Sequence, residues 1–552
     1  MKDTCLAIKT QVFNIQNNKK FQNPIKDFEI FDINDKEKLD EYSITEYCND
    51  ITNFGLEDTW NKIIYYTLHF SDNNPFLSID NFGELYEIGL ALTNKQCKKN
   101  SGQYYTPEDV ATVMSTWFDK LEAETICDVA CGTGKLILTY LNLIGKEKAL
   151  QIINEGRLYL YDLDKTALNI CKTILTKKYG KAVSKVHFIH CDFLDAKIVL
   201  PKNCKVISNP PYSTVDTLLP AWDKTSVAAD SKELYSMFME KILKQSNSSV
   251  IITPYSFIGG NKFYSLRFLM NNHNGFIVSF DNVPGNIFCG RKHGIFNTNT
   301  SNSVRAAITV VENNDNVKGF RLTPLLRFRT DERARLLNCT VLESYISNKV
   351  QIVDKKHPAY SKIHKELQNI YDSWLRISGD KTVKDITSSA QTNYVLHVPN
   401  TCRYFTTASV RKLNRTGLMT LYVQDETNYK FLYCLINSSF AYWWWRIFDG
   451  GITYPIGLLN KMPVFSDMLS NDDKAFFNNI FNEMVNIEED CITTKLNAGA
   501  KQENIKFPSI YREKINERLL RILSCNEDYK LLNLLHQNNV FQENTDDQSR
   551  KI

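Results

Sequence analysis

An apolar stretch, a glycine-rich turn and a second apolar stretch constrain the fold of this chain more than any other feature. Thr125–Ala130 has the composition of a buried strand, Cys131–Gly134 contains two glycines, and Leu136–Ile144 has the pattern of an apolar helix. A strand, a glycine turn and a helix are typical of the first unit of a doubly wound sheet, in which the glycines let the backbone approach a ligand. The predicted fold class is therefore α/β, with a Rossmann-like parallel sheet.

A loop that binds a nucleotide triphosphate is the competing interpretation of this turn. Such a loop needs Ser or Thr after Lys135, where the chain has Leu136, and an earlier glycine where the chain has Val129. These two positions exclude it, and a ligand of another kind is expected at the turn.

Further buried strands are predicted after the turn, and each is followed by a polar side chain. The strands and the polar residues are Arg157–Tyr161 with Asp162, Val186–His190 with Asp192, and Lys205–Ser208 with Asn209. The carboxyl ends of strands in an open parallel sheet line one crevice. Asp128, Asp162, Asp192 and Asn209 are therefore expected to face the same cleft.

The two acids that follow the second and third strands suit different parts of a nucleoside. Asp162 can accept hydrogen bonds from both hydroxyls of a ribose. Asp192 is placed to accept from the amino group of an adenine ring, and Phe193 to pack on that ring. Helix capping is the alternative role for Asp192, and it is the expected role for Asp164.

The tetrapeptide Asn209-Pro210-Pro211-Tyr212 comes directly after the fourth strand. Two prolines stiffen the backbone and remove two donors. The side-chain oxygen of Asn209 and the carbonyl of Pro210 can both accept from one exocyclic amino group, while the ring of Tyr212 offers a face for stacking. The segment is thus a candidate receptor for an amino group on an aromatic heterocycle; a Pro-Pro turn with an incidental Asn and Tyr is the alternative.

The amino-acid composition indicates a folded protein of several domains, but it does not identify a binding partner. The chain has 552 residues, of which 43% are hydrophobic and 23% charged, and its net charge of +4 is too small to identify a polyanion partner. Its fourteen cysteines lack zinc-site spacing, so no metal is predicted. The N-terminus has no secretion signal and no stretch is long enough to span a membrane, so a cytoplasmic protein is expected.

Later parts of the chain suggest a basic, aromatic region. Between Thr401 and Thr420 the basic residues stand without an intervening acid, which favours contact with phosphate; they are Arg403, Arg411, Lys412 and Arg415. Four arginines between Arg327 and Arg335 suggest an exposed basic connection, and Trp443–Trp445 is expected to mix core and surface contacts. Residues 470–535 are predicted to be helical. The polar loop 213–230 is long enough to close over a site.

Together these motifs resemble those of the N6-adenine DNA methyltransferases, close to the methylation subunits of Type I restriction-modification systems and to solitary adenine methylases. Five motifs occur in the order of that family: Gln103–Pro107, Asp128–Gly134, Asp162–Asp164, Asp192–Phe193 and Asn209–Tyr212. The segment Asn437–Arg446 is similar, less specifically, to the end of the target-recognition region of the family. Val129 and Lys135 depart from the Pro and Gly that the family often has, and both lie beside the expected donor site.

The resemblance implies S-adenosylmethionine as methyl donor and assigns roles to individual residues. The implied donor-binding residues are Tyr105, Thr106, Pro107, Asp128, Ala130, Gly132, Gly134, Asp162, Asp192 and Phe193. The implied catalytic residues are Asn209, Pro210, Pro211 and Tyr212, and Tyr212 and Phe288 would stack on the base. The expected DNA-binding residues are Arg291 and Lys292 in the loop after Phe288, with Arg403, Arg411, Lys412 and Arg415.

The predicted domains are an N-terminal helical region (1–100), a catalytic domain (101–325), an α+β target-recognition domain that binds DNA (326–468) and a C-terminal helical region with a tail (469–552). The expected activity is site-specific transfer of a methyl group to N6 of an adenine flipped out of duplex DNA, in a bacterial or phage restriction-modification or defence setting. A specificity or restriction subunit is a possible partner, and a nucleoid-associated location follows.

Two other functions stay open. N4-cytosine methylation uses the same amino-group chemistry, although those enzymes more often have Ser at the position of Asn209. The chain could also be a DNA-binding subunit that is inactive without a separate specificity protein. Methylation of a glutamine amide uses the same tetrapeptide but does not explain the long region after the catalytic motifs, and no nuclease site is recognisable before them.

Overall fold

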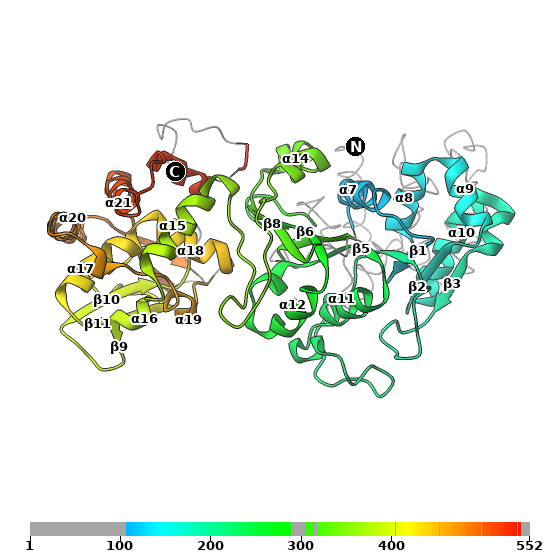
Figure 1. Ribbon diagram of the computed structural model, residues 1–552, viewed down its shortest axis with the longest axis horizontal. Coiled ribbons are helices and arrows are strands. Elements are labelled where there is room, and N and C mark those ends of the chain that lie inside the picture. Colours follow the sequence, from blue (N-terminus) through cyan, green and yellow to red (C-terminus); the bar gives the residue numbers. More distant parts are fainter. Residues whose placement is uncertain are drawn as a thin grey trace, which may run out of the picture.

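The structure, a computed structural model, describes residues 106–288, 304–312, 317–402, 404–451, 453–497, 500–537 and 539–541. Tyr105, Arg291, Lys292 and Arg403 lie outside these residues, as does the predicted N-terminal helical region. The described chain forms two lobes that lie side by side (Figure 1). Residues 106–346 form the first lobe, and most of residues 360–541 form the second.

An eight-stranded sheet forms the centre of the first lobe, with the order β3-β2-β1-β4-β5-β7-β6-β8. The strands are β1 (Thr125–Val129), β2 (Leu158–Asp162), β3 (His187–His190), β4 (Cys204–Ser208), β5 (Ser248–Pro254), β6 (Asn274–Phe280), β7 (Ala306–Glu312) and β8 (Gly319–Leu326). β7 runs antiparallel to β5 and β6, and the other neighbouring pairs are parallel. The predicted α/β class and Rossmann-like sheet are confirmed.

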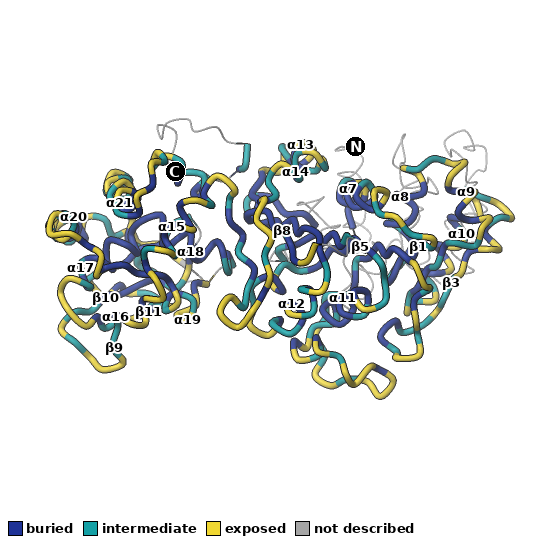
Figure 2. The backbone as a smooth tube through the Cα atoms, in the orientation of Figure 1, coloured by how far each residue is buried: buried dark blue, intermediate teal, exposed yellow. Residues whose placement is uncertain are grey.

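Helices cover both faces of this sheet because its strands carry apolar side chains on both sides, as parallel strands generally do. On one face Ile126 and Leu160 pack with α7 (Glu108–Asp119), α8 (Lys135–Ile144), α9 (Lys146–Asn154) and α10 (Lys165–Tyr179). On the other face Cys127 and Val206 pack with α11 (Leu234–Gln245) and α12 (Tyr264–Met270). Figure 2 shows the strands as mostly buried and the outer helices as alternately buried and exposed.

The register of the sheet brings the motifs that follow its strands to one edge. Val129 pairs with Tyr161 and with Ser208, and Asp162 pairs with His190. The residues that follow β1, β2, β3 and β4 therefore meet at the carboxyl edge. Asp164 caps α10 as predicted, because its side chain accepts from the backbone N–H groups of Thr166 and Ala167.

The second lobe is an α+β unit with one hydrophobic core, which runs from Ile363 to Leu535 and crosses the domain boundary predicted at residue 468. A three-stranded antiparallel sheet has the order β10-β11-β9. The main elements are β9 (Thr387–Ser388), β10 (Tyr394–Pro399), β11 (Leu418–Val423), α15 (Gln368–Ser378), α17 (Glu426–Asn437), α18 (Ser439–Phe448), α20 (Asn471–Asn486) and α21 (Ser509–Ile522). The domain bounds themselves stay a prediction.

Two expectations for the second lobe are wrong. Trp443, Trp444 and Trp445 are all buried, at 1%, 6% and 1% exposure. Because α18 is enclosed by its neighbours, residues pointing in three directions around it all reach the core. Residues 470–535 are not helical throughout, since the hairpin of β12 (Ile492–Asn497) and β13 (Ala500–Ile505) separates α20 from α21. The β-branched residues of β12 favour a strand.

The arginines at the start of the connection between the lobes are not all exposed, which corrects a further prediction. Arg327 is 7% exposed and pairs with Asp281, while Arg333 is 9% exposed and pairs with Asp109. Their acidic partners lie far away in the sequence, so the local pattern gives no sign of the pairing. Arg446 of α18 also pairs with Asp281 and thereby joins the two lobes.

None of the helices in the described part of the chain combines the length and the apolar character that a membrane-spanning segment requires.

Candidate active site

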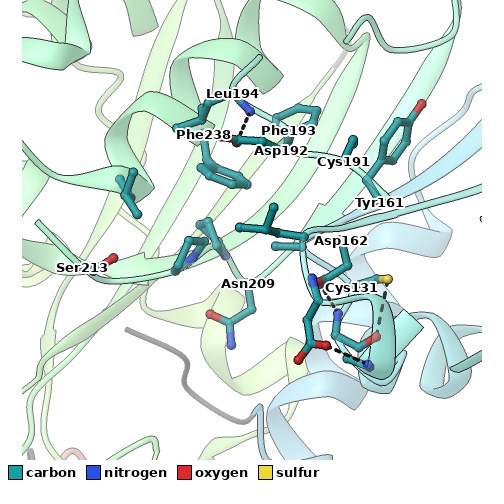
Figure 3. A pocket seen from close by; sticks show the side chains of 18 of the residues that line it. Cys131, Tyr161, Asp162, Cys191, Asp192, Phe193, Leu194, Asn209, Ser213 and Phe238 are labelled. Atoms are coloured by element: carbon teal, nitrogen blue, oxygen red, sulfur yellow. Dashed lines mark hydrogen bonds between the residues drawn. The ribbon is translucent and has the colours of Figure 1, made fainter. Parts of the chain in front are cut away.

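A cavity of about 460 Å³ opens at the carboxyl edge of the sheet. Figure 3 shows Asp162, Asp192 and Asn209 arranged around it. The predicted site residues that line the cavity are Thr106, Ala130, Gly132, Asp162, Asp192, Phe193, Asn209, Pro210 and Pro211. Among the described residues predicted to bind the donor or the base, five do not line it: Pro107, Asp128, Gly134, Tyr212 and Phe288. The strand ends thus meet as predicted, with exceptions that have identifiable causes.

The turn after β1 places backbone N–H groups beside the end of β2. Ala130 and Gly132 have φ values of 58° and 53°, in the left-handed region that glycine adopts at little cost. This conformation directs the N–H of Gly132 to Oδ2 of Asp162, at 2.6 Å. The N–H of Asp164 donates to Oδ1 of the same carboxylate, at 2.7 Å. Asp162 is therefore fixed in position at the mouth of the turn.

The carboxyl group of Asp162 titrates in an unusual range. Burial raises the pKa of Asp162 to about 6, although the backbone N–H groups of Asp164 and Gly132 favour its ionised form. Near neutral pH the group is mostly a carboxylate with lone pairs left for a ligand. Below about pH 6 it becomes protonated.

Asp128, Gly134 and Pro107 were predicted to bind the donor, and none of the three lines the cavity. Asp128 lies within β1, one residue before the strand ends, so it is fully buried on the same face as Ile126. Burial, followed by the charge of Asp162, raises its pKa well above the ordinary value. At Gly134 an added Cβ would overlap with Sγ of Cys171, so this glycine allows α8 to pack on α10. Pro107 is the N-cap of α7.

Asp192 is held by two donors, one of which sequence reasoning missed. The N–H of Leu194 donates to its Oδ1 at 3.0 Å, and the indole Nε1 of Trp222 donates to its Oδ2 at 2.6 Å. Trp222 belongs to the loop 213–230, which also contributes Ser213, Thr214, Val215 and Leu219 to the lining. The loop therefore forms part of the cavity wall.

The side-chain amide of Asn209 has a partner on each side. Its Nδ2 donates to Oγ1 of Thr106 at 2.9 Å, and its Oδ1 accepts from the hydroxyl of Tyr212 at 2.7 Å. The same hydroxyl lies 3.1 Å from the carbonyl oxygen of Ile252 in β5. Asn209 is therefore presented to the cavity with its oxygen already acting as an acceptor.

The two aromatic residues expected to stack on a base contact each other instead. The rings of Tyr212 and Phe288 are 5.8 Å apart and inclined by 64°, an edge-to-face contact, and Tyr212 also meets the edge of Tyr235. Neither Tyr212 nor Phe288 lines the cavity. In this conformation they form an aromatic cluster behind Asn209 and do not enclose a flat ligand.

Comparison with known proteins shows a similarity over the part of the chain that contains this site. Residues 77–321 match the family model described as N-6 DNA Methylase. This segment, 245 of the 552 residues, is similar to that family. The match contains the cavity, the sheet strands up to β7 and the tetrapeptide Asn209–Tyr212, and the predicted recognition is confirmed.

Two curated relatives match part of the chain. The Type I restriction enzyme MpnII methylase subunit of Mycoplasma pneumoniae is 28% identical over 153 residues, which is 25% of this chain and 26% of the relative. The Type II methyltransferase M.VspI of a Vibrio species is 28% identical over 222 residues, which is 38% of this chain and 50% of the relative. The chain thus spans about a quarter and about half of these two relatives.

Among solved structures, the Type I restriction-modification methyltransferase subunit of Streptococcus thermophilus is similar at 15% identity with a TM-score of 0.33. The similarity covers 57% of this chain and 61% of that subunit.

Of the residues predicted to bind DNA outside the methylase segment, Arg411 is paired with acids, one just before the β12–β13 hairpin and one within it. Arg411 pairs with Glu489 and Glu503. Arg415 donates to Oδ1 of Asn504 at 2.6 Å, while Lys412 is exposed. The absence of nearby acids in the sequence was misleading, because the acids arrive from a segment much later in the chain.

A second, basic cavity lies between the lobes. The volume of this cavity is about 850 Å³. One of its lining residues, Asp281, directly follows β6. β6 runs parallel to β4, so this cavity opens at the same edge of the sheet as Asn209. The basic residues that line it are Arg305, Arg327, Arg415, Lys495 and Lys506. Among its described lining residues Asp281 is the only acid, which makes this cleft the better candidate for a phosphate backbone.

Proposed function

We propose that the chain transfers a methyl group from S-adenosylmethionine to the N6 amino group of an adenine extruded from duplex DNA. The observation that carries this proposal is the placement of Asn209. Asn209 directly follows β4 and lines the same cavity as Asp162 and Asp192, and its Oδ1 acts as a hydrogen-bond acceptor. An amino-group acceptor beside a nucleoside-sized cavity is what methylation of a base amino group requires.

The residues of the cavity fit S-adenosylmethionine. Asp162 would accept from the ribose hydroxyls, Asp192 from the amino group of the adenine ring, and Phe193 would pack on that ring. Among the described lining residues there are three carboxylates, of Asp162, Asp164 and Asp192, and one cation, Lys135, which suits a positively charged donor. When bound there, the donor would supply a methyl group from its sulfonium sulfur. The leaving group would be a neutral thioether.

Asn209 and Pro210 would activate the base. The lone pair of an adenine amino group is delocalised into the ring, so the nitrogen is a weak nucleophile. Hydrogen bonds from this group to Oδ1 of Asn209 and to the carbonyl of Pro210 would favour tetrahedral geometry and localise the pair. No strong general base is needed, because the proton becomes acidic as the new bond forms.

Tyr212 must exchange partners for the base to enter. Its hydroxyl holds the acceptor oxygen of Asn209 at 2.7 Å, the position that the amino group of the base would take. Release of this hydroxyl would free the Tyr212 ring to stack on the extruded base, which offsets part of the few kcal/mol that extrusion costs. Phe288 is the neighbouring aromatic residue for the same role.

Methyl transfer by the purified chain tests this function. Duplex DNA, S-adenosylmethionine with a labelled methyl group and the protein should give labelled DNA, and the label should be absent when Asn209 is replaced by alanine. N4-cytosine methylation is the runner-up, and Asn at position 209 favours adenine over it.

Dependence on a separate specificity subunit is a second candidate, which the name of the Mycoplasma pneumoniae relative as a methylase subunit favours. In that case the purified chain alone would bind S-adenosylmethionine and leave DNA unlabelled. Addition of a specificity protein encoded beside it would then restore labelling.

The cleft between the lobes is the proposed contact for the DNA backbone. Lys495→Gln and Lys506→Gln together should weaken DNA binding and lower the slope of log affinity against log salt by roughly 0.9 per lost phosphate contact. Lys412→Gln is the matched control, since this exposed lysine does not line the cleft. Fluorescence anisotropy over a salt series measures both. An unchanged slope in the double variant, or an equal effect in the control, would contradict the proposed contact.

The affinity for S-adenosylmethionine should rise with pH between 5 and 7. The pKa of Asp162 is raised to about 6, so the group is mostly protonated at pH 5 and mostly ionised at pH 7. The carboxylate is the stronger acceptor for ribose hydroxyls, and below the pKa the affinity should fall by up to about tenfold per pH unit. Calorimetry across this range measures the effect.

Asp162→Asn is the control for this pH profile. It should bind more weakly at pH 7 and remove the slope between pH 5 and 7. The same raised pKa means that the folded protein binds this proton more tightly than the unfolded chain does, so Asp162 lowers stability as pH rises from about 4 to about 6. A flat wild-type binding profile would rule out ionised Asp162 as the ribose acceptor.

A further inference from the structure

The loop 213–230 contributes a tryptophan to the adenine end of the donor cavity. Trp222 is 8% exposed, lines the cavity and donates its indole N–H to Oδ2 of Asp192 at 2.6 Å. An indole nitrogen is only a donor and a carboxylate oxygen only an acceptor, so the direction of this bond is unambiguous. The side chain that would read the amino group of the donor is thus held by a residue outside the family motifs of the sequence.

Trp222 is itself fixed to the segment after β3. It forms an antiparallel bridge with Asp195, and the N–H of Ala196 donates to the carbonyl of Ala221 at 2.9 Å. Farther along the loop, the carboxylate of Glu240 accepts from the hydroxyl of Ser226 at 2.6 Å and from the N–H of Ala228 at 2.9 Å. The loop is therefore anchored on both sides of Trp222, so the indole N–H has a defined position.

Two hydrogen-bond donors fix the orientation of the Asp192 carboxylate. The N–H of Leu194 holds one oxygen and Trp222 the other, so rotation of the carboxylate would break a charge-assisted bond in either direction. Each oxygen keeps a second lone pair, which can accept from an exocyclic amino group. A carboxylate in this orientation repels a carbonyl oxygen at the same place, so it selects a 6-amino purine over a 6-oxo purine.

We infer that Trp222 is a positioning residue for the methyl donor, which orients Asp192 so that the adenine amino group is recognised. This rests on the proposed function, in which S-adenosylmethionine occupies the cavity. Trp222 lines the donor cavity and has no hydrogen bond to Asn209 or Tyr212 among the described contacts. Its loss is therefore expected to act on donor affinity and on purine selection.

Ligand binding to the purified full chain tests this inference without reference to turnover. Trp222→Phe should weaken S-adenosylhomocysteine binding by about tenfold, because it removes a hydrogen bond to a charged group. Trp222→His keeps a ring N–H and should lie between the wild type and Trp222→Phe. Trp117→Phe is the matched control, because it removes an equivalent indole bond, to Glu343 at 2.8 Å, away from the cavity.

The selectivity between two ligands distinguishes a positioning role of Trp222 from general structural damage in the variant. The preference for S-adenosylhomocysteine over S-inosylhomocysteine should fall in Trp222→Phe, whereas general damage would weaken both ligands equally. Asp192→Asn should make the further change Trp222→Phe nearly neutral, since the two residues act as a unit. Thermal unfolding checks that each variant is folded.

The outcomes distinguish the inference from the function on which it rests. If the wild type binds S-adenosylhomocysteine and Trp222→Phe binds it equally well, or loses affinity with unchanged selectivity, the inference is wrong and the proposed function stands. If the wild type binds neither S-adenosylmethionine nor S-adenosylhomocysteine, both are wrong.

Discussion

Replacement of Asn209 by alanine is expected to lower kcat for methyl transfer by about 10³-fold, the effect of removing one preorganised transition-state acceptor or donor. Asn209 lines the cavity, and hydrogen bonds to Thr106 and Tyr212 set the orientation of its amide. Alanine removes the acceptor and leaves β4 and the donor-binding acids in place. Single-turnover rates of methyl transfer to duplex DNA measure the change.

Donor binding and folding serve as controls for this result. Asn209→Ala should bind S-adenosylmethionine with little change, because Asp162 and Asp192 stay intact. Asn169→Ala, an exposed asparagine on α10, should retain full activity. Turnover by Asn209→Ala within tenfold of the wild type would remove the tetrapeptide from the mechanism.

Asp281→Asn is expected to lower the free energy of unfolding by about 3–5 kcal/mol, because it leaves buried arginines without their shared carboxylate. Arg305 and Arg327 from the first lobe and Arg446 from the second all pair with Asp281, whose side chain is 1% exposed. Denaturant unfolding measures the loss. Asp331→Asn, at an exposed position, should change stability by less than about 0.5 kcal/mol.

The same cluster predicts how stability depends on acid. Burial alone would raise the pKa of Asp281, but Arg446, Arg305 and Arg327 hold it well below its ordinary value. A depressed pKa contributes stability above the unfolded-state value near 4, and this contribution is lost as pH falls below about 4. A loss under 1 kcal/mol in Asp281→Asn, or an acid dependence that this variant keeps, would show that the ion cluster does not stabilise the junction.

The parts of the site that sequence reasoning predicted are those set by local pattern. The strand, glycine turn and helix at Thr125–Ile144 and the acids after the next strands have fixed places in a parallel sheet. Because the strand ends share one edge, Asp162, Asp192 and Asn209 meet in one cavity. Asp128 was expected to face the cleft, but its position inside β1 turns the side chain into the core.

The parts that could not be predicted depend on partners distant in sequence. Arg411 looks like a free cation until the β12–β13 hairpin brings Glu489 and Glu503 beside it. Trp222 has no motif, and only the fold shows that it reaches Asp192. Tyr212 lies in the predicted tetrapeptide, yet its hydrogen bond to Asn209 turns it away from the cavity.

Identification of the methylated base tests the central claim most directly. Duplex DNA exposed to the purified chain and S-adenosylmethionine, with its specificity partner where one is required, is digested to nucleosides and analysed by mass spectrometry. The proposed function predicts N6-methyladenine, and its absence when Asn209→Ala replaces the wild type. N4-methylcytosine in the digest, or methylated protein with unmodified DNA, would contradict it.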